Sequence, residues 1–242
     1  MENKNRLDLN EQIYLATLLL YRCETNFSLT ETDFQNFSVN EKYSNQVFNV
    51  LCQKEIIEYD GTTDEIKCNL NVTDDELHAV QNLLNQTPTE IIKNQKEIVE
   101  FWKLIASYEI QEYFELLLKK KFNISQYNDQ DNIRNKFTNL LKNFAQGQIY
   151  SMLYSSVNYV LKKNENLDDN EIVGYITGCT FRHANNAITK DWNVFYYDRP
   201  YAIKQSNLSK CFFTNILGFD DNSYLHITIE QFLRQTYARL TS

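Results

Sequence analysis

The sequence predicts a mainly α-helical protein of two domains, and three observations lead to this prediction. Its 242 residues include only two prolines and five glycines, too few for a loop-rich β-sandwich. Apolar residues recur at intervals of three and four over most of the chain, which is the period of an amphipathic helix. The length is sufficient for two modest domains, each with a core of its own.

Two helices are predicted before residue 38. A broad apolar stripe predicts the first over residues 11–23, with Asn10 as its N-cap. Thr30 and Asp33 have the spacing of a capping box, with aspartate in place of the usual glutamate. They predict a short second helix that ends near Phe37.

Residues 38–70 predict a third helix followed by a β-hairpin. Ser38 and Glu41 repeat the capping-box spacing at the start of this helix. The dipeptide Asp60-Gly61 favours a tight hairpin turn. The residues after it alternate between apolar and polar, as a half-buried strand does, with Ile66, Cys68 and Leu70 on the apolar side.

The order of three helices and a two-stranded hairpin resembles that of winged-helix domains. The resemblance covers roughly residues 10–70 and depends on the order of the elements and their caps, because no diagnostic motif is present. It implies a domain that reads nucleic acid with its third helix, or a descendant that docks on protein. The predicted fold class is therefore mainly α, with an N-terminal winged helix of three helices and a two-stranded β-wing, followed by a C-terminal helical domain.

The second domain is predicted to begin at Thr87. Thr87, Pro88 and Glu90 form the clearest helix start in the chain: a capping threonine, a proline at the first helical position and a glutamate at the third. Apolar residues then recur at threes and fours without a breaker as far as Phe122, which predicts one long helix. The two domains are predicted at residues 1–86 and 87–242.

Further helices are predicted in the C-terminal domain, with starts near Asp168 and at residues 228–231, and an end at Gly218. Gly174 and Gly178 lie four positions apart inside one of them. Each glycine costs a helix about 1 kcal/mol relative to alanine. This cost predicts that another segment packs closely against the two glycines.

The charge distribution bears on the use of the predicted winged helix. Residues 1–87 contain 6 basic and 15 acidic side chains, whereas residues 88–242 contain 18 basic and 17 acidic ones. Basic contacts to phosphate supply most of the non-specific affinity for DNA, so a net charge of −9 disfavours DNA as the partner. The outward face of the third helix still carries side chains suited to base edges or to a protein partner: Lys42, Asn45, Gln46 and Asn49.

A second candidate site lies within residues 182–201. His183 falls on an apolar helical stripe, which favours a hydrogen-bonded core histidine over a catalytic or metal-binding one. The aromatic segment that follows has the composition of a protein interface, or else it closes the helical core over Gly174 and Gly178. Its predicted interaction residues are Tyr196, Tyr197, Asp198 and Arg199.

The five cysteines are scattered without a C-x-x-C pair, which predicts free thiols in a reducing compartment and no zinc site. No cofactor and no other metal is predicted. No apolar run is long enough to span a bilayer and no signal-peptide pattern is present, so a cytoplasmic location is expected.

These observations predict a non-enzymatic regulatory or adaptor protein. It would bind a protein partner through the acidic winged helix and the helical domain, with homo-oligomerisation, as a dimer, as a further role of the latter. The alternative is a winged-helix transcriptional regulator that binds DNA as a dimer. A third reading is an enzyme with a site around His183, although the chain lacks G-x-S-x-G, H-E-x-x-H and a phosphate-binding glycine loop.

Overall fold

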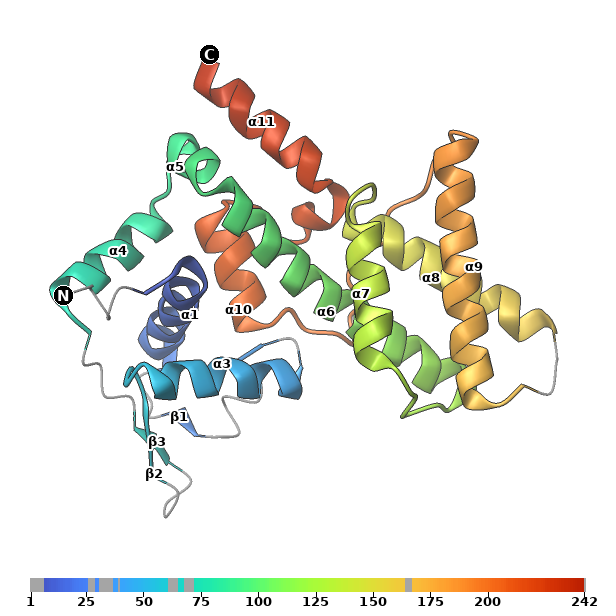
Figure 1. Cartoon of the computed structure of the whole chain (residues 1–242), viewed down its shortest axis with the longest axis horizontal. Helices are drawn as coiled ribbons and strands as arrows, with labels where there is room; N and C mark the ends of the chain where they lie inside the picture. The colour runs from blue at the N-terminus through green and yellow to red at the C-terminus, as the bar shows by residue number, and fades with distance from the viewer. Residues whose placement is uncertain are drawn as a thin grey trace. The chain divides into compact units, whose positions relative to one another are not determined.

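The computed structural model of the chain is mainly helical, as predicted (Figure 1). It describes residues 7–25, 29–30, 37–38, 40–60, 65–67, 72–163 and 167–241. Backbone contacts divide the chain into two compact units. Unit 1 is formed by Met1–Phe101, Gln205–Asp220 and Thr236–Ser242, and unit 2 by Trp102–Lys204 and Asp221–Gln235. The predicted division at residues 86 and 87 into separately folding domains stays a prediction.

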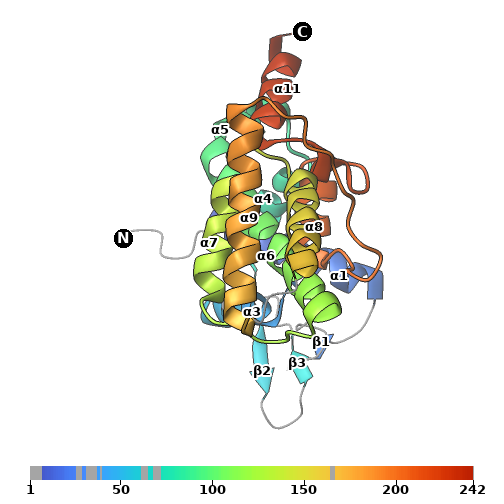
Figure 2. The same ribbon diagram turned by 90° about the vertical axis from the view of Figure 1, so that its right-hand side faces the viewer.

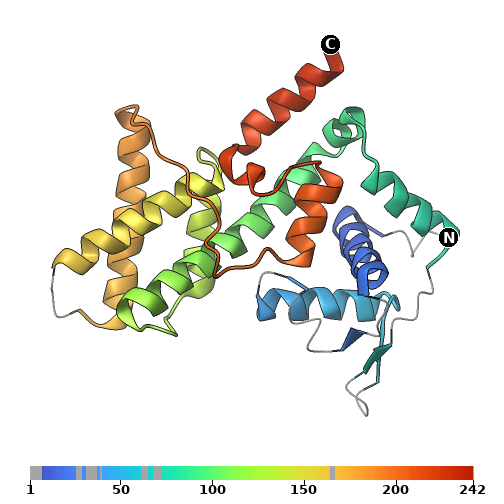
Figure 3. The ribbon, with the colours of Figure 1, turned by 180° about the vertical axis from the view of Figure 1, so that it is seen from behind.

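Unit 1 is built around α1 (Leu9–Thr25), which packs against helices from both ends of the chain (Figure 3). Its neighbours are α3 (Glu41–Gln53), α4 (Asp74–Leu84), α10 (Asn207–Lys210) and the π-helix η1 (Cys211–Ile216). Phe101 and Phe212 meet edge to face in the core, with ring centroids 4.9 Å apart. Helices α10 and η1, from late in the chain, therefore complete the core of this unit.

A three-stranded antiparallel sheet stands where a two-stranded wing was predicted, so the predicted fold class is wrong in its β part. Its order is β1-β3-β2, with strands β1 (Leu29–Thr30), β2 (Glu58–Asp60) and β3 (Glu65–Lys67). Thr30, which was predicted to cap a helix, pairs with Glu65 of β3 instead. A strand of two residues is too short to show an alternating pattern, which is why the sequence did not reveal it.

Parts of the N-terminal prediction fall outside the described residues. These are the predicted helix between residues 31 and 36, the hairpin turn at residues 61–64 and the strand positions at residues 68–70. In the described part, β2 and β3 are paired directly to one another.

The helix caps are largely those that the sequence predicts. Reciprocal capping boxes join Thr73 to Glu76, Thr87 to Glu90 and Asp168 to Glu171, and Thr228 and Gln231 exchange the same pair of hydrogen bonds. Two predicted caps are wrong, because a neighbouring side chain has the better geometry. Asp8 and Glu11 cap α1 in place of Asn10, and Asn40 accepts from the Tyr43 N–H at 2.8 Å in place of Ser38.

Two predicted helices are interrupted. The helix predicted from Thr87 to Phe122 divides at Asn94 into α5 (Pro88–Lys93) and α6 (Gln95–Phe122). The helix predicted to end at Gly218 begins as α10 and widens into the π-helix η1. It ends as predicted at Gly218, whose φ of 72° is the left-handed conformation that glycine adopts readily.

Unit 2 contains most of α6 together with α7 (Gln130–Leu140), α8 (Gln146–Lys163), α9 (Asp169–Thr189) and the 3-10 helix η2 (Ser223–His226). Helix α8 lies along α9 (Figure 2). Phe114 of α6 meets Phe137 of α7 edge to face at 5.6 Å, and Trp102 meets Phe232 of α11 (Ile229–Thr241) at 5.2 Å. The second of these contacts joins helices that are distant in sequence.

The prediction for Gly174 and Gly178 is wrong. Both glycines are exposed, and a Cβ built at either position meets no heavy atom within 4 Å outside its own helix. The segment after α9 does not pack on them. No helix in the described ranges combines the length and the apolar character that a membrane span needs.

Candidate functional site

A buried ion pair lies in the interior of unit 2. Glu109, in the middle of α6, has a fully buried side chain, and the side chain of Arg199 is only 6% exposed. The guanidinium Nη2 is 2.5 Å from the Glu109 carboxylate. Burial, the largest single effect, lowers the pKa of Arg199, but the charge and hydrogen bond of Glu109 together with Tyr150 and Tyr224 outweigh it, so the net shift is upward. The guanidinium of Arg199 therefore stays charged in the interior.

Three polar side chains complete the surroundings of this pair. Gln146 donates from Nε2 to the Glu109 carboxylate at 2.8 Å, and the Tyr224 hydroxyl lies 3.3 Å from the same oxygen. Arg199 also donates to the Tyr224 hydroxyl, and Tyr150 lies within the network. Burial raises the pKa of Tyr150 well above its ordinary value, so its hydroxyl stays protonated. The network draws on α6, α8, η2 and the segment after α9.

Residues 192–201, hereafter the aromatic loop, are held against the first turn of α8. The Tyr197 N–H donates to the Gly147 carbonyl at 3.0 Å. A Cβ at Gly147 would lie 2.7 Å from the Tyr197 carbonyl oxygen and 2.9 Å from that of Leu225. Only glycine permits so close an approach of two backbone segments. The close packing predicted at Gly174 and Gly178 is found at Gly147 instead.

The outer side of the aromatic loop presents large rings to solvent. Phe195 is 74% exposed and Tyr201 is fully exposed, and three further rings are between about one third and one half exposed: Trp192, Tyr196 and Tyr197. The Asp198 carboxylate lies 2.7 Å from Nε2 of His226, and the Tyr196 ring packs beside the same histidine. The loop therefore combines a fixed backbone with an exposed aromatic surface.

The residues predicted for this loop divide into two groups. Tyr196, Tyr197 and Asp198 are exposed, whereas Arg199 points inward to Glu109. Sequence reasoning missed Glu109, Phe195 and Tyr201. Consecutive aromatic residues around position 195 were a usable signal for the exposed surface, but nothing in the local sequence indicates that Glu109 is the partner of Arg199.

A pocket of about 310 Å³ adjoins the end of the aromatic loop. Its walls are partly apolar and include Leu118, Ile124 and Ile203. Its polar groups are Glu112, Glu115, Lys119, Ser125 and Tyr127. Ile203 is fixed by an N–H bond to the Pro200 carbonyl, which connects the pocket wall to the loop.

The two glutamates of this pocket differ in their partners. Glu115 accepts from Gln111 Nε2 at 2.9 Å and from the Tyr127 hydroxyl at 3.3 Å. Within the described residues, Glu112 has no hydrogen-bond or ion-pair partner. Burial and the nearby negative charge of Glu109 raise the pKa of Glu112 to about 7, against a smaller opposing effect of Arg199. Glu112 is thus a half-buried carboxyl without an ion-paired cation of its own among the described residues.

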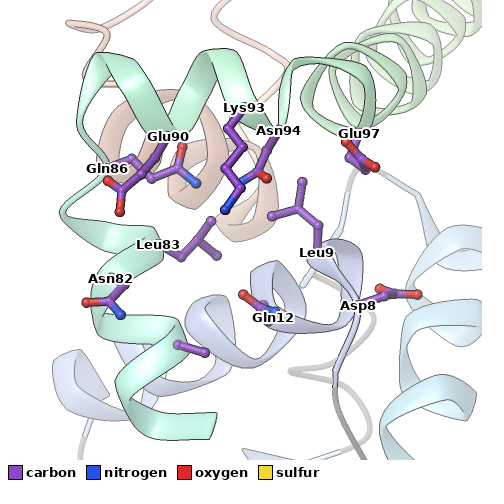
Figure 4. A pocket seen from close by; sticks show the side chains of 11 residues that line it. Asp8, Leu9, Gln12, Asn82, Leu83, Gln86, Glu90, Lys93, Asn94 and Glu97 are labelled. Carbon is purple, nitrogen blue, oxygen red and sulfur yellow. The ribbon is translucent and has the colours of Figure 1, made fainter. Parts of the chain in front are cut away.

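A larger pocket lies in unit 1 between α1, α4 and α5 (Figure 4). It has a volume of about 540 Å³, and amide side chains such as Gln12, Asn82 and Gln86 line it. Two of its carboxylates, Asp8 and Glu90, are occupied by the caps of α1 and α5. Few charged groups therefore remain available to a ligand.

The other predicted site residues belong neither to the aromatic loop nor to the linings of these two pockets. Lys42, Asn45, Gln46 and Asn49 are exposed on α3, opposite the buried Tyr43 and Val47, so a binding role for this face stays a prediction. His183 is half-buried without a hydrogen bond among the described residues, and burial lowers its pKa. No group of three or more metal-ligating side chains occurs in the described part of the chain.

The cysteines with described side chains, Cys52, Cys179 and Cys211, are free thiols, as predicted. Comparison with known proteins gives no assignment: no family model, no curated protein and no solved structure matches this chain.

Proposed function

We propose that this protein acts without catalysis, as a regulator or adaptor that binds another protein through the aromatic loop of unit 2. The observation that carries the proposal is the exposure of five aromatic rings on a backbone segment held by Arg199 and Gly147. Aromatic residues are enriched in the energetically dominant parts of protein interfaces. A pre-ordered loop also loses little conformational entropy on binding.

The charge near the loop favours protein over nucleic acid as the partner. Its acidic residue Asp198 is paired with His226, and its basic residue Arg199 is paired with buried Glu109. Unit 2 as a whole has 14 basic and 13 acidic side chains, so it lacks the strong positive charge of a phosphate-binding surface.

Phe195→Ala and Tyr201→Ala are expected to weaken capture of the partner by about thirtyfold or more, because truncation of a central interface aromatic costs at least about 2 kcal/mol. The measurement is quantitative capture from a lysate of the source cells with wild-type and variant protein as bait. Both side chains are exposed, so the variants should keep wild-type thermal stability.

Tyr159→Ala is the matched control, since Tyr159 is a 47% exposed aromatic residue on α8 outside the aromatic loop. It should capture the partner like the wild type. If the loop variants and this control retain the same proteins equally well, the proposal is wrong.

Binding of random duplex DNA is expected to be absent or weak even at low salt, because unit 1 carries 10 basic and 19 acidic side chains. A gel-shift assay tests this expectation. Tight, salt-sensitive binding that is lost on changing Lys42 and Asn45 to alanine would favour a DNA-binding regulator instead.

A further inference from the structure

The pocket beside the aromatic loop has the chemistry of a receptor for a basic side chain. A lysine or arginine consists of an aliphatic stem with a cation at its end. Leu118, Ile124 and Ile203 offer apolar contacts for the stem, and Glu112 and Glu115 offer carboxylates for the cation. A volume of about 310 Å³ is sufficient for one such side chain.

We propose that this pocket receives an arginine or lysine side chain of the protein partner, next to the aromatic contacts made by the loop. This inference rests on the proposed function, and it specifies the partner as a segment with a basic residue beside an apolar one. The partner's cation would pair with Glu112 and share the carboxylate of Glu115.

The state of Glu112 is the first support for this assignment. A half-buried carboxyl has lost part of its hydration, and in most proteins such a group is compensated by a cation or by several donors. Glu112 has no hydrogen-bond donor and no ion-paired cation within the described residues, because the nearby Arg199 is paired with Glu109. A guanidinium or ammonium group in the pocket would supply the missing charge.

A second buried acceptor lies beside Glu115, on Gln111, which is not itself part of the pocket wall. The Gln111 side chain is 4% exposed and donates to Glu115, but its own Oε1 has no hydrogen-bond partner. Unpaired acceptors in the interior are rare because each costs free energy. The two carboxylates in the pocket wall, Glu112 and Glu115, favour a ligand that carries several N–H groups, such as a guanidinium.

The position of the pocket gives the third support. Ala202 and Ile203 line it and directly follow Tyr201, the most exposed ring of the aromatic loop. A partner segment bound to Tyr201 thus has the pocket within reach of a neighbouring side chain. The aromatic loop and the carboxylates of Glu112 and Glu115 would then bind one continuous segment of the partner.

The pocket is tested with n-butylguanidinium, which has the stem and the cation of arginine and stays charged at every pH used. Uncharged n-butylurea is the matched control probe. In an NMR titration at pH 8, we expect saturable shifts of the amide signals of Glu112, Glu115 and Ile203 with butylguanidinium and much weaker ones with butylurea. Equal binding of the two probes, or shifts confined to other residues, would overturn the proposal.

Affinity for butylguanidinium is expected to rise about tenfold from pH 6 to pH 8, because Glu112 with a pKa of about 7 becomes ionised over this range. Three charged groups act on it, namely Glu109 and Glu115 on the same helix and Arg199 from the aromatic loop, and Tyr127 and Lys119 line the same pocket. Lys119, at the same pocket, competes with the probe, so Lys119→Gln should strengthen binding. A pH-independent affinity would contradict the role of Glu112.

Glu112→Gln should weaken butylguanidinium binding at pH 8 by about tenfold and abolish its pH dependence, whereas Glu230→Gln, at an exposed position, should change neither. The variant should also fold well: a carboxyl whose pKa folding raises from 4.5 to about 7 destabilises the folded state progressively as the pH rises between these values, and fully above about pH 7. Its thermal stability at pH 8 should therefore equal or exceed that of the wild type.

Capture of the partner separates this inference from the proposed function. Glu112→Gln should reduce capture at pH 8, and Glu230→Gln should not. If Phe195→Ala abolishes capture while butylguanidinium does not bind, the function stands and the cation pocket is wrong. If butylguanidinium binds but capture is insensitive to Phe195→Ala, the proposed function is wrong, and with it the assignment of the pocket to a partner's side chain.

Discussion

Replacing Arg199 with alanine should lower the free energy of unfolding by about 3–5 kcal/mol, because it leaves the Glu109 carboxylate buried without its counter-ion. Gln146 and Tyr224 still donate to the carboxylate, but two neutral donors do not replace a full positive charge. Urea denaturation at neutral pH followed by circular dichroism measures the change. The aromatic loop should also lose its fixed position, seen as altered fluorescence of Trp192.

The matched control is Arg234→Ala, which removes an exposed ion pair with Glu230 and should change stability by no more than about 0.5 kcal/mol. The double variant Arg199→Leu with Glu109→Leu should recover much of the loss, because replacing both buried charges by apolar side chains removes the uncompensated charge. Equal stability of Arg199→Ala and the wild type would show that the pair contributes little to the fold.

Gly147→Ala and Gly178→Ala should change stability in opposite directions. At Gly147, a Cβ would lie 2.7 Å and 2.9 Å from two carbonyl oxygens of the backbone, so the aromatic loop or η2 must move. We expect a loss of about 1–3 kcal/mol, as for other overpacked sites. Gly178 lies exposed inside α9 with no atom near its Cβ position, so alanine should raise stability by up to about 1 kcal/mol.

Thermal or urea denaturation of the two variants checks this prediction, with each variant as the control for the other. Gly147→Ala should also weaken partner capture, because it displaces the exposed rings of the aromatic loop, whereas Gly178→Ala should not. Destabilisation by both substitutions to the same extent would contradict the assigned packing.

Both predictions concern the same structural feature. Arg199 holds the aromatic loop through its buried ion pair with Glu109. Gly147 holds it through close contact between two backbone segments. The exposed rings of the loop depend on these two interactions for their position. A loss of either one should therefore reduce binding without any change in the aromatic residues themselves.

The helical part of the fold could be predicted because its signals are local. Thr73, Thr87 and Asp168 cap their helices through hydrogen bonds to residues three positions later, and that spacing is visible in the sequence. The exposed polar face of α3 follows from helical periodicity in the same way. By itself, the sequence determined the helical class, most helix starts and the acidic character of the N-terminal part.

Only the tertiary structure decided which segments meet. Glu109 and Arg199 are far apart in the chain, and no periodicity relates a carboxylate in one helix to an arginine in a later loop. Gly147 and the glycines of α9 are alike in sequence, yet only Gly147 lies under another backbone. Likewise, Thr30 has the pattern of a helix cap but pairs with β3. Local hydrogen bonds are encoded by neighbours along the chain, whereas the candidate site is formed by contacts that exist only once the helices have packed.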